Sequence, residues 1–363
     1  MDTVFNRRVR PPLVGVAIAG CVCASGAAMA QQGQTVGAEQ EQVIRDAEPS
    51  RSVQDIFREE HALFSDRLTI EPGITYTYSD RDSLALRGFL ALDAIFLGEL
   101  NLDNVETHIT TIDINTRYGL TDRLEASVNV PFVYRTTTFQ SIGGDTSTEQ
   151  NTEDDVDESA LGDISASLSY RLLPETLERP DVVVSLGVRA PTGKDPYGIG
   201  IRTDPDNSNL NLPEELPTGN GVWGVTAGVS VLKTLDPAIV FANLGYTYNI
   251  EESFDDISAG SGDQEADVDL GDSISAGFGT AFALNERLSL ALSYSHEYIR
   301  KTEITPDGGS SNEVVGSDAN IGVFNIGGTY AMTDSTSVVT NLGIGMTDDA
   351  SDISLTFRMP FQL

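Results

Sequence analysis

The chain has 363 residues, a formal net charge of −33 and a hydrophobic share of 40%. So acidic a balance argues against nucleic acid as a partner, because the phosphate backbone binds cationic surfaces. No uncharged apolar run reaches the roughly 18 residues that a membrane-spanning helix requires, so helical membrane proteins are excluded.

The first 30 residues are typical of a secretory signal peptide. They combine a basic start, an apolar segment at 13–19 and a small-residue cleavage site at 28–30. Cleavage there removes both cysteines, Cys21 and Cys23, and leaves no disulfide or cysteine metal site. Residues 18–21 also resemble a lipoprotein processing box, so lipidation at Cys21 is the alternative.

The segment 31–66 is predicted to be periplasmic. Its polar first part, 31–50, is expected to be flexible, and 51–65 is expected to form a helix with Ser52 as its N-cap. The helix has one apolar face. This face comprises Val53, Ile56, Phe57, Leu63 and Phe64. The helix would either pack at the mouth of the domain that follows or enter that domain as a plug.

From residue 67 onward, apolar side chains alternate with small or polar ones. In the segment 164–172 the apolar set is Ile164, Ala166, Leu168, Tyr170 and Leu172. The same alternation returns at 124–134, 240–250, 288–294 and 353–363. Each strand therefore has one apolar face without charges and one face too polar and too small to fill a core. A sheet that is apolar outside and wet inside is typical of an outer-membrane β-barrel.

Short and long connections alternate along 67–363. The short ones lie at 119–122, 173–181, 233–237, 284–286 and 333–335. The longer ones lie at about 136–160, 194–218, 251–267 and 302–317, with a shorter one at 347–350. With both termini in the periplasm, the pattern predicts an all-β, transmembrane, antiparallel up-and-down barrel of about 12 strands. Residues 83–104 are then an outer hairpin, although a further strand is the alternative.

Aromatic residues gather near the ends of the predicted strands. Those near the long loops are Tyr76, Tyr78, Phe132, Tyr134, Trp223, Tyr246, Tyr248, Tyr294 and Tyr298. Tyr118, Tyr330 and Phe361 mark the opposite rim. Two such belts suit the two interfaces of a membrane, so outer-membrane lipid is an expected partner. The final strand resembles the signal that the barrel assembly machinery recognises.

The inward positions predict a hydrated lumen with charged side chains. Small residues such as Ser165, Ser167, Gly277 and Gly279 leave space inside. The candidate pore-lining residues are Glu71, Asp113, Arg117, Glu125, Arg135, Asp163, Arg171, Arg189 and Arg358. Salt bridges between neighbouring strands are the favoured explanation for them. A transverse field that orients a passing solute is the alternative.

Nothing in the sequence indicates catalysis. The histidines His61, His108 and His296 lie far apart, and there is no nucleophile elbow, phosphate loop or zinc spacing. No cofactor or metal is predicted, and the acidic outer loops are read as solvated surface. The oxygen-rich segment 204–211 lacks the glycine and terminal glutamate of a calcium loop.

Several phrases resemble one outer-membrane family, labelled phenol meta-pathway transporters. They lie at 118–124, 130–132, 190–198, 216–221 and 236–238. Within that family the chain looks most similar to the secretion channel of the Fap functional-amyloid system. The resemblance implies a 12-stranded barrel, with a periplasmic segment able to block the lumen, that exports unfolded amyloid subunits. The long coiled coil of that channel is absent, which puts coiled-coil trimerisation and its gate in doubt.

We therefore expect a transport channel in the outer membrane of a Gram-negative bacterium that exports an amyloid-type polypeptide. Passive uptake of small aromatic or hydrophobic compounds is the first alternative, and a structural or adhesive surface barrel is the second. The sequence leaves the substrate, the gating and a homo-oligomeric state open.

Overall fold

The computed structural model describes residues 68–82, 86–91, 94–100, 104–142, 151–203, 211–258, 262–333 and 335–363. The predicted signal peptide and the segment 31–66 lie outside the described residues. The same is true of the plug candidates Val53, Ile56, Phe57, Leu63 and Phe64, and of most of the oxygen-rich segment 204–211.

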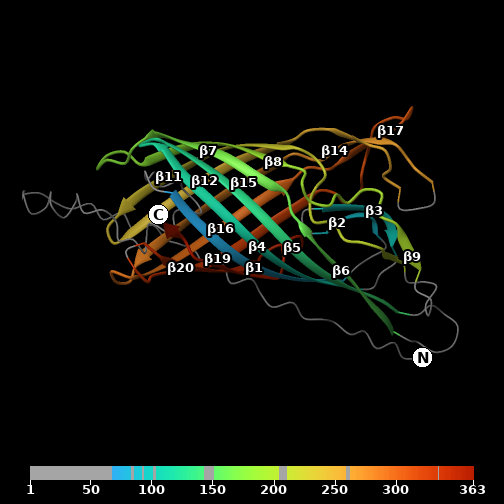
Figure 1. Cartoon of the computed structure of the whole chain (residues 1–363), viewed down its shortest axis with the longest axis horizontal. Coiled ribbons are helices and arrows are strands. Elements are labelled where there is room, and N and C mark those ends of the chain that lie inside the picture. The colour runs from blue at the N-terminus through green and yellow to red at the C-terminus, as the bar shows by residue number, and fades with distance from the viewer. Residues whose placement is uncertain are drawn as a thin grey trace, which may run out of the picture. The chain divides into compact units, whose positions relative to one another are not determined.

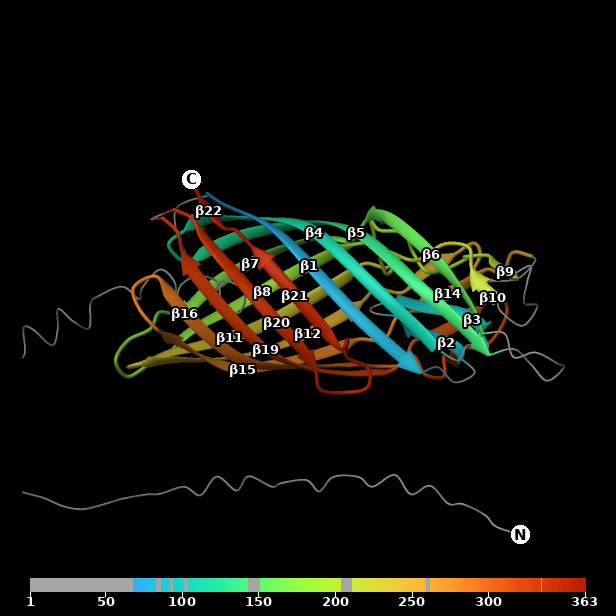
Figure 2. The same ribbon diagram turned by 90° about the horizontal axis from the view of Figure 1, so that it is seen from below.

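Twelve antiparallel strands close into a barrel, as the alternation predicts (Figures 1 and 2). In ring order they are β1 (Leu68–Asp82), β4 (Asn104–Thr121), β5 (Leu124–Ile142), β6 (Asn151–Leu161) with β7 (Ile164–Leu173), β8 (Asp181–Ala190), β11 (Gly224–Leu235), β12 (Ala238–Asn249), β15 (Ser273–Ala283), β16 (Leu288–Ile299), β19 (Ala319–Ala331), β20 (Ser337–Gly345), and β21 (Ile353–Arg358) with β22 (Phe361–Gln362). Pairing of β21 with β1 completes the ring. No helix among the described residues is long and apolar enough to cross a membrane.

Two of the twelve strands are interrupted. β6 and β7 pair with successive parts of β5 and are separated by Gly162 and Asp163. β21 and β22 pair with successive parts of β1 on either side of Pro360, which has no N–H to give to the ladder. The break at Gly162 is the more important one, because loop residues bind to it from inside the barrel.

The barrel exposes its apolar stripes and buries its polar ones. Leu244 of β12 is 54% exposed and Phe278 of β15 is 63% exposed, whereas Glu71 and Asp113, at inward positions, are 3% and 4% exposed. The aromatic side chains predicted for the two rims, such as Tyr248 and Tyr118, are likewise exposed. The apolar stripes are therefore not packed against one another, as they would be in a soluble sandwich.

The two ends of the barrel differ in their connections. At the short-turn end, tight turns such as the one at 236–237 join the strands, as predicted. At the long-loop end, β2 (Leu86–Ala91) and β3 (Ala94–Leu100) form the expected hairpin between β1 and β4. Two small sheets lie within the predicted long loops. They consist of β9 (Ile201–Thr203) with β10 (Asn211–Pro213), and of β13 (Glu252–Phe254), β14 (Ala266–Asp269), β17 (Glu303–Pro306) and β18 (Asn312–Glu313).

The predicted loop at 136–160 is wrong in its bounds. β5 continues to Ile142 and β6 begins at Asn151, so most of this segment is paired strand. On its outer face the Thr136 hydroxyl donates to Asp157 at 2.6 Å and the Thr138 hydroxyl donates to Asp155 at 2.7 Å. Beyond the membrane both faces of a strand can meet water, so the apolar stripe ends before the strand does.

Candidate functional site: the barrel lumen

The inner surface of the barrel has two halves of different chemistry. The charged wall consists of the inward positions of β21, β1, β4, β5, β6, β7 and β8. The neutral wall consists of the inward positions of β11, β12, β15, β16, β19 and β20, and among the described residues Glu297 is the one charged side chain there. All candidate pore-lining residues lie on the charged wall.

Most of these candidates form ion pairs. The atom pairs are Arg117 Nε–Glu71 Oε2 at 3.5 Å, Arg171 Nε–Asp181 Oδ2 at 3.3 Å, Arg358 Nη2–Asp113 Oδ2 at 3.7 Å and Arg189 Nε–Asp163 Oδ2 at 3.9 Å. Glu125 and Arg135 are buried inside the barrel and line cavities. Salt bridging across strands is therefore present. A role of these side chains in passage stays a prediction.

One glycine lets an ion pair form across an entire strand. Gly73 of β1 stands between Asp113 on one neighbouring strand and Arg358 on the other. A Cβ added at Gly73 would lie 2.7 Å from Asp113 Oδ1 and 3.2 Å from Arg358 Cγ. The missing side chain leaves the space in which these two residues meet.

The neutral wall has an apolar cluster at its short-turn end. Leu232, Ile239, Phe241, Ala281 and Ala291 pack together there at inward positions. Gly279 lies beneath the Phe241 ring, because a Cβ at Gly279 would come within 2.5 Å of Phe241 Cζ. The lumen therefore offers apolar surface on one side and paired charges on the other.

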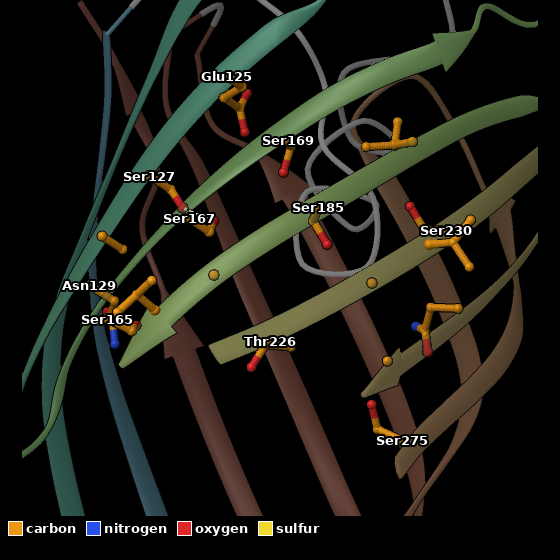
Figure 3. A pocket seen from close by; sticks show the side chains of 18 of the residues that line it. Glu125, Ser127, Asn129, Ser165, Ser167, Ser169, Ser185, Thr226, Ser230 and Ser275 are labelled. Atoms are coloured by element: carbon orange, nitrogen blue, oxygen red, sulfur yellow. Dashed lines mark hydrogen bonds between the residues drawn. The ribbon is translucent and has the colours of Figure 1, made fainter. Parts of the chain in front are cut away.

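Between the two walls lies a cavity of about 530 Å³, which we call the hydroxyl cavity (Figure 3). Its lining includes Ser127, Asn129, Ser165, Ser167, Ser169, Ser185, Thr226, Ser230, Asn243 and Ser275, with Glu125, Arg117 and Arg189 at its edges. Figure 3 shows the labelled side chains standing on the inner side of neighbouring strands. Gly187, Gly228 and Gly245 also line the cavity and, having no side chain, take up none of its space. Such a lining offers many hydrogen bonds and no large side chain that would fill the space.

The connection between β8 and β11 folds into the long-loop end of the barrel. We call its described residues, 191–203 and 211–223, the mouth loop. Its Ile199, Leu212 and Leu216 pack against Phe139 and Val156, whose side chains lie on the inner faces of β5 and β6. The long connection predicted at 194–218 is therefore present, but it packs into the mouth of the barrel. Apolar residues in this loop bury themselves inside the mouth rather than standing in water.

A second cavity, of about 260 Å³, lies between the mouth loop and the charged wall. We call it the outer cavity. Its lining consists of Thr77, Ile109, Thr111, Val133, Arg135, Pro217, Thr218, Gly219, Asn220 and Ser351. On β5, Asn129 lines the hydroxyl cavity and Val133 the outer cavity, so the two cavities follow one another along the lumen.

The mouth loop also binds the break between β6 and β7. The Asp163 carboxylate accepts hydrogen bonds from the Gly193 N–H at 3.0 Å and from the Asn220 N–H at 2.9 Å. The Thr192 hydroxyl donates to the Gly162 carbonyl at 2.8 Å, and the Thr218 hydroxyl donates to the Leu161 carbonyl at 2.9 Å. We call this set the clamp.

Two copies of one short phrase build the clamp. Pro-Thr-Gly occurs at 191–193 and again at 217–219, and each copy supplies one threonine hydroxyl to the break. The two glycines touch, since a Cβ at Gly193 would lie 2.7 Å from the Gly219 Cα. The repeated phrase was the available sequence signal, but it could not say that its copies meet.

Lys194 fixes the clamp from the side of the loops. Its ammonium donates to Glu158 at 2.7 Å and pairs with Glu215 at 2.5 Å. Burial lowers the pKa of this ammonium, but its hydrogen bonds to Glu158 and Glu215 raise the pKa by more, so the net shift is upward. Lys194 therefore keeps its charge at neutral pH and holds the mouth loop to β6.

No group of three or more His, Cys, Asp or Glu side chains in the described ranges is placed to hold a metal ion. His296 shares a hydrogen bond of 3.0 Å with the Tyr294 hydroxyl. His108 likewise bonds the Tyr76 hydroxyl at 2.7 Å. Both histidines lie in the outer aromatic belt.

A closed barrel with an apolar exterior and a polar bore is an outer-membrane β-barrel, because such a surface is stable only in lipid. The family model described as "Putative MetA-pathway of phenol degradation" matches residues 98–361. The chain belongs to that family. The comparisons leave the likeness to the amyloid secretion channel a prediction.

Among solved structures, the chain is similar to an outer membrane channel from Pseudomonas putida F1. The identity is 16% and the TM-score 0.52, over 88% of this chain and 100% of that one. A weaker likeness links it to the toluene transporter TodX of Pseudomonas putida, with 12% identity and a TM-score of 0.43 over 82% of this chain and 91% of that one. The first likeness supports the barrel fold.

Proposed function

We propose that the protein is a passive channel for small solutes that combine a hydrogen-bonding group with an apolar part. Hydroxylated single-ring aromatic compounds are the class that fits best. The observation that carries this proposal is the pair of cavities in series, of about 260 and 530 Å³, inside one lumen. The family's description, which names phenol degradation, supports the same class.

The chemistry of the lumen suits a solute of this kind. The hydroxyl cavity provides donors and acceptors from Ser127, Ser167, Ser185 and other hydroxyls. The cluster around Phe241 provides apolar surface toward the short-turn end. A purely apolar solute would displace water from this polar lining without offering hydrogen bonds in return, which disfavours it. A ring with a hydroxyl group satisfies both surfaces.

The clamp favours small solutes over polypeptides. It joins the mouth loop to the break near Asp163, and its Thr218, Gly219 and Asn220 line the outer cavity. An unfolded chain needs a continuous passage, whereas a single ring can move from one cavity to the next when the clamp fluctuates. Export of an amyloid-type polypeptide, expected from the sequence resemblance, would require the mouth loop to leave the lumen altogether.

Single-channel recording in planar bilayers tests the proposal. Hydroxylated aromatics added on one side should interrupt the ion current for short, concentration-dependent periods, while glycerol should not. Filling the hydroxyl cavity with Gly187→Trp should reduce the current several-fold, because a Cβ at Gly187 has only ordinary contacts of 3.7 Å or more and the ring can enter the space.

Leu186→Trp is the matched control, since this neighbouring side chain faces the lipid and does not line the cavity. Equal currents in the two variants would refute a conducting hydroxyl cavity. Long blockades by an unfolded polypeptide, without blockades by aromatics, would favour export instead.

A further inference from the structure

We propose that the hydroxyl cavity binds single-ring solutes that carry two polar groups at opposite ends of the ring, and that Ser185 and Ser275 each bind one of these groups. This inference rests on the proposed channel function and goes beyond it by naming the substitution pattern of the solute and the two residues that select it. The features that carry it are two facing glycines in the wall of the cavity, with one serine hydroxyl on either side of them.

The two glycines leave a gap among the side chains of the cavity wall. Gly228 of β11 and Gly245 of β12 are opposite one another in the strand register, and both line the cavity. Residues opposite each other in an antiparallel pair place their Cβ atoms about 4.5–5.5 Å apart on one face of the sheet. Two neighbouring positions without side chains therefore leave one continuous area of bare backbone. We call this area the glycine floor.

A serine borders the glycine floor on each side. Ser185 of β8 is opposite Gly228 in the register, and Ser275 of β15 is opposite Gly245. The hydroxyls lean over the glycines. A Cβ built on Gly228 would lie 2.7 Å from Ser185 Oγ, and one built on Gly245 would lie 2.5 Å from Ser275 Oγ. In Figure 3 the strands β11 and β12 separate the two serines.

The two bordering hydroxyls differ from others in the cavity in their hydrogen bonding. The Ser127 and Ser167 hydroxyls, for example, share a hydrogen bond of 2.7 Å across β5 and β7. Within the described part of the chain, Ser185 and Ser275 take part in no such pair. A serine hydroxyl both donates and accepts, so each of the two can bind a phenol, an alcohol or an amine group of a solute.

The separation of the two hydroxyls suits a ring that lies between them. The Cβ positions over the glycine floor are about 5 Å apart, and the hydroxyl oxygens lie a further 2.7 and 2.5 Å beyond them. The two oxygens are therefore roughly 8–10 Å apart. A benzene ring with polar groups at opposite ends, plus a hydrogen bond of about 2.8 Å at each end, covers a similar length. Polar groups on adjacent ring positions point to the same side and reach only one serine.

The cavity is large enough for this mode of binding. Its volume of about 530 Å³ lies within the roughly 300–1,000 Å³ of pockets for small ligands. Val183 lies two positions before Ser185 on β8 and also lines the cavity, so it offers an apolar side chain beside the glycine floor. A ring on the floor can therefore place its face against backbone and its edge against Val183 while its two polar ends point to the serines.

The test compares the para, meta and ortho isomers of hydroxybenzyl alcohol, together with phenol, as blockers of the single-channel current. The isomers are neutral and differ only in the placement of their polar groups. In the unaltered protein we expect the para isomer to have the lowest dissociation constant. In Ser185→Ala and in Ser275→Ala this constant should rise about fivefold, because one hydrogen bond is lost. The constant of phenol should rise by about twofold at most, because phenol can use the remaining serine.

Ser159→Ala is the matched control. Ser159 is exposed on β6 and does not line the cavity, so the same substitution there should leave all four constants unchanged. Gly228→Ala provides a second test, since its methyl group would occupy the glycine floor and displace the Ser185 hydroxyl. That hydroxyl can rotate, and the next nearest atom lies 3.7 Å away, so the barrel accommodates the methyl group. This variant should weaken binding of the para isomer at least as much as Ser185→Ala. Folding is checked by the mobility shift on heating in detergent gels.

Three outcomes are decisive. A preference for the para isomer that is lost in both serine variants supports the site. Absence of this preference in the unaltered protein, or its survival in either serine variant, overturns the site. The proposed channel function then still stands, because aromatic solutes block the current. Absence of blockade by every aromatic solute overturns both proposals.

Discussion

The two walls of the lumen differ in the kinds of side chain that occupy their inward positions. On the charged wall, carboxylates and arginines come from neighbouring or next-neighbouring strands and neutralise one another, as Glu71 and Arg117 do. On the neutral wall, small and hydroxylated residues take the inward positions, and Gly279 makes room for the Phe241 ring. Large polar side chains thus pair with one another along one wall, while the hydroxyl cavity extends onto the other. A 12-stranded barrel can keep a bore in this way without widening.

An arginine placed on the lipid-facing side of the neutral wall should give the largest loss of stability, compared with an arginine on its lumen side. Leu244→Arg puts a cation against lipid near the middle of β12, and the unfolding free energy should fall by about 2–4 kcal/mol. Asn243→Arg puts the same cation into the aqueous lumen, where the loss should be below about 1 kcal/mol, while the current changes. Urea-induced unfolding in vesicles measures both. Equal losses would contradict the assignment of the faces.

The second largest loss of stability is expected at Gly279 of the neutral wall. In Gly279→Ala the new Cβ would lie 2.6 Å from Ser293 Cβ and 2.7 Å from the Leu292 carbonyl, in addition to meeting the Phe241 ring. We expect a loss of about 1–3 kcal/mol from overpacking. Gly327→Ala on β19 is the control, because its Cβ would have nothing closer than 3.5 Å. The temperature at which each variant changes its mobility in a detergent gel measures the difference in stability. Equal temperatures for the two variants would contradict overpacking at Gly279.

On the charged wall, breaking one ion pair should cost somewhat less. Arg358→Met leaves Asp113 buried without that cation, and we expect a loss of about 1–2 kcal/mol, since lumen water offsets part of the penalty for an unpaired buried charge. Asp113→Leu in the same chain should recover part of the loss. A double-mutant cycle on unfolding free energies measures the coupling between the two residues. A coupling of zero would mean that the pair contributes nothing across Gly73.

Loosening the clamp should have the smallest effect on stability and a clear effect on current. Asp163→Ala removes the acceptor for Gly193 and Asn220, at a cost of about 1 kcal/mol or less, because the barrel ladder remains intact. The mean current should rise and become noisier as the mouth loop moves. Asp122→Ala, at an exposed turn of the short-turn end, serves as control. A current that stays the same in both would remove the clamp from the conducting path.

Much of the fold was predictable because alternate residues of a membrane-spanning strand face lipid and the lumen, and their side chains differ accordingly. The inward placement of Ser165 and Arg171, and the outward placement of Leu168, follow from this period alone. The outer hairpin at 83–104 followed from the even strand number. The bounds of β5 and β6 could not be predicted in this way, because a strand beyond the lipid needs no apolar face. Asp155 and Asp157 therefore look like loop residues in the sequence.

The sequence predicted less well which residues pair with one another inside the lumen. Asp181 was not among the predicted charges, although it pairs with Arg171, because it stands at the start of a strand beside a predicted turn. The mouth loop has a polar and proline-rich sequence that is typical of a surface loop. Its inward path depends on Ile199, Leu212 and Leu216 meeting Phe139, a contact between segments far apart in the chain.

By itself, the sequence determined the architecture, the sidedness of the strands and which charges face the bore. These properties are local, because alternation and turn residues act within a few positions of the chain. Only the tertiary structure decided that two Pro-Thr-Gly phrases meet at the break beside Asp163 and that one of them lines the outer cavity. That arrangement depends on closing the ring, which brings distant segments into contact inside a space that no single strand defines.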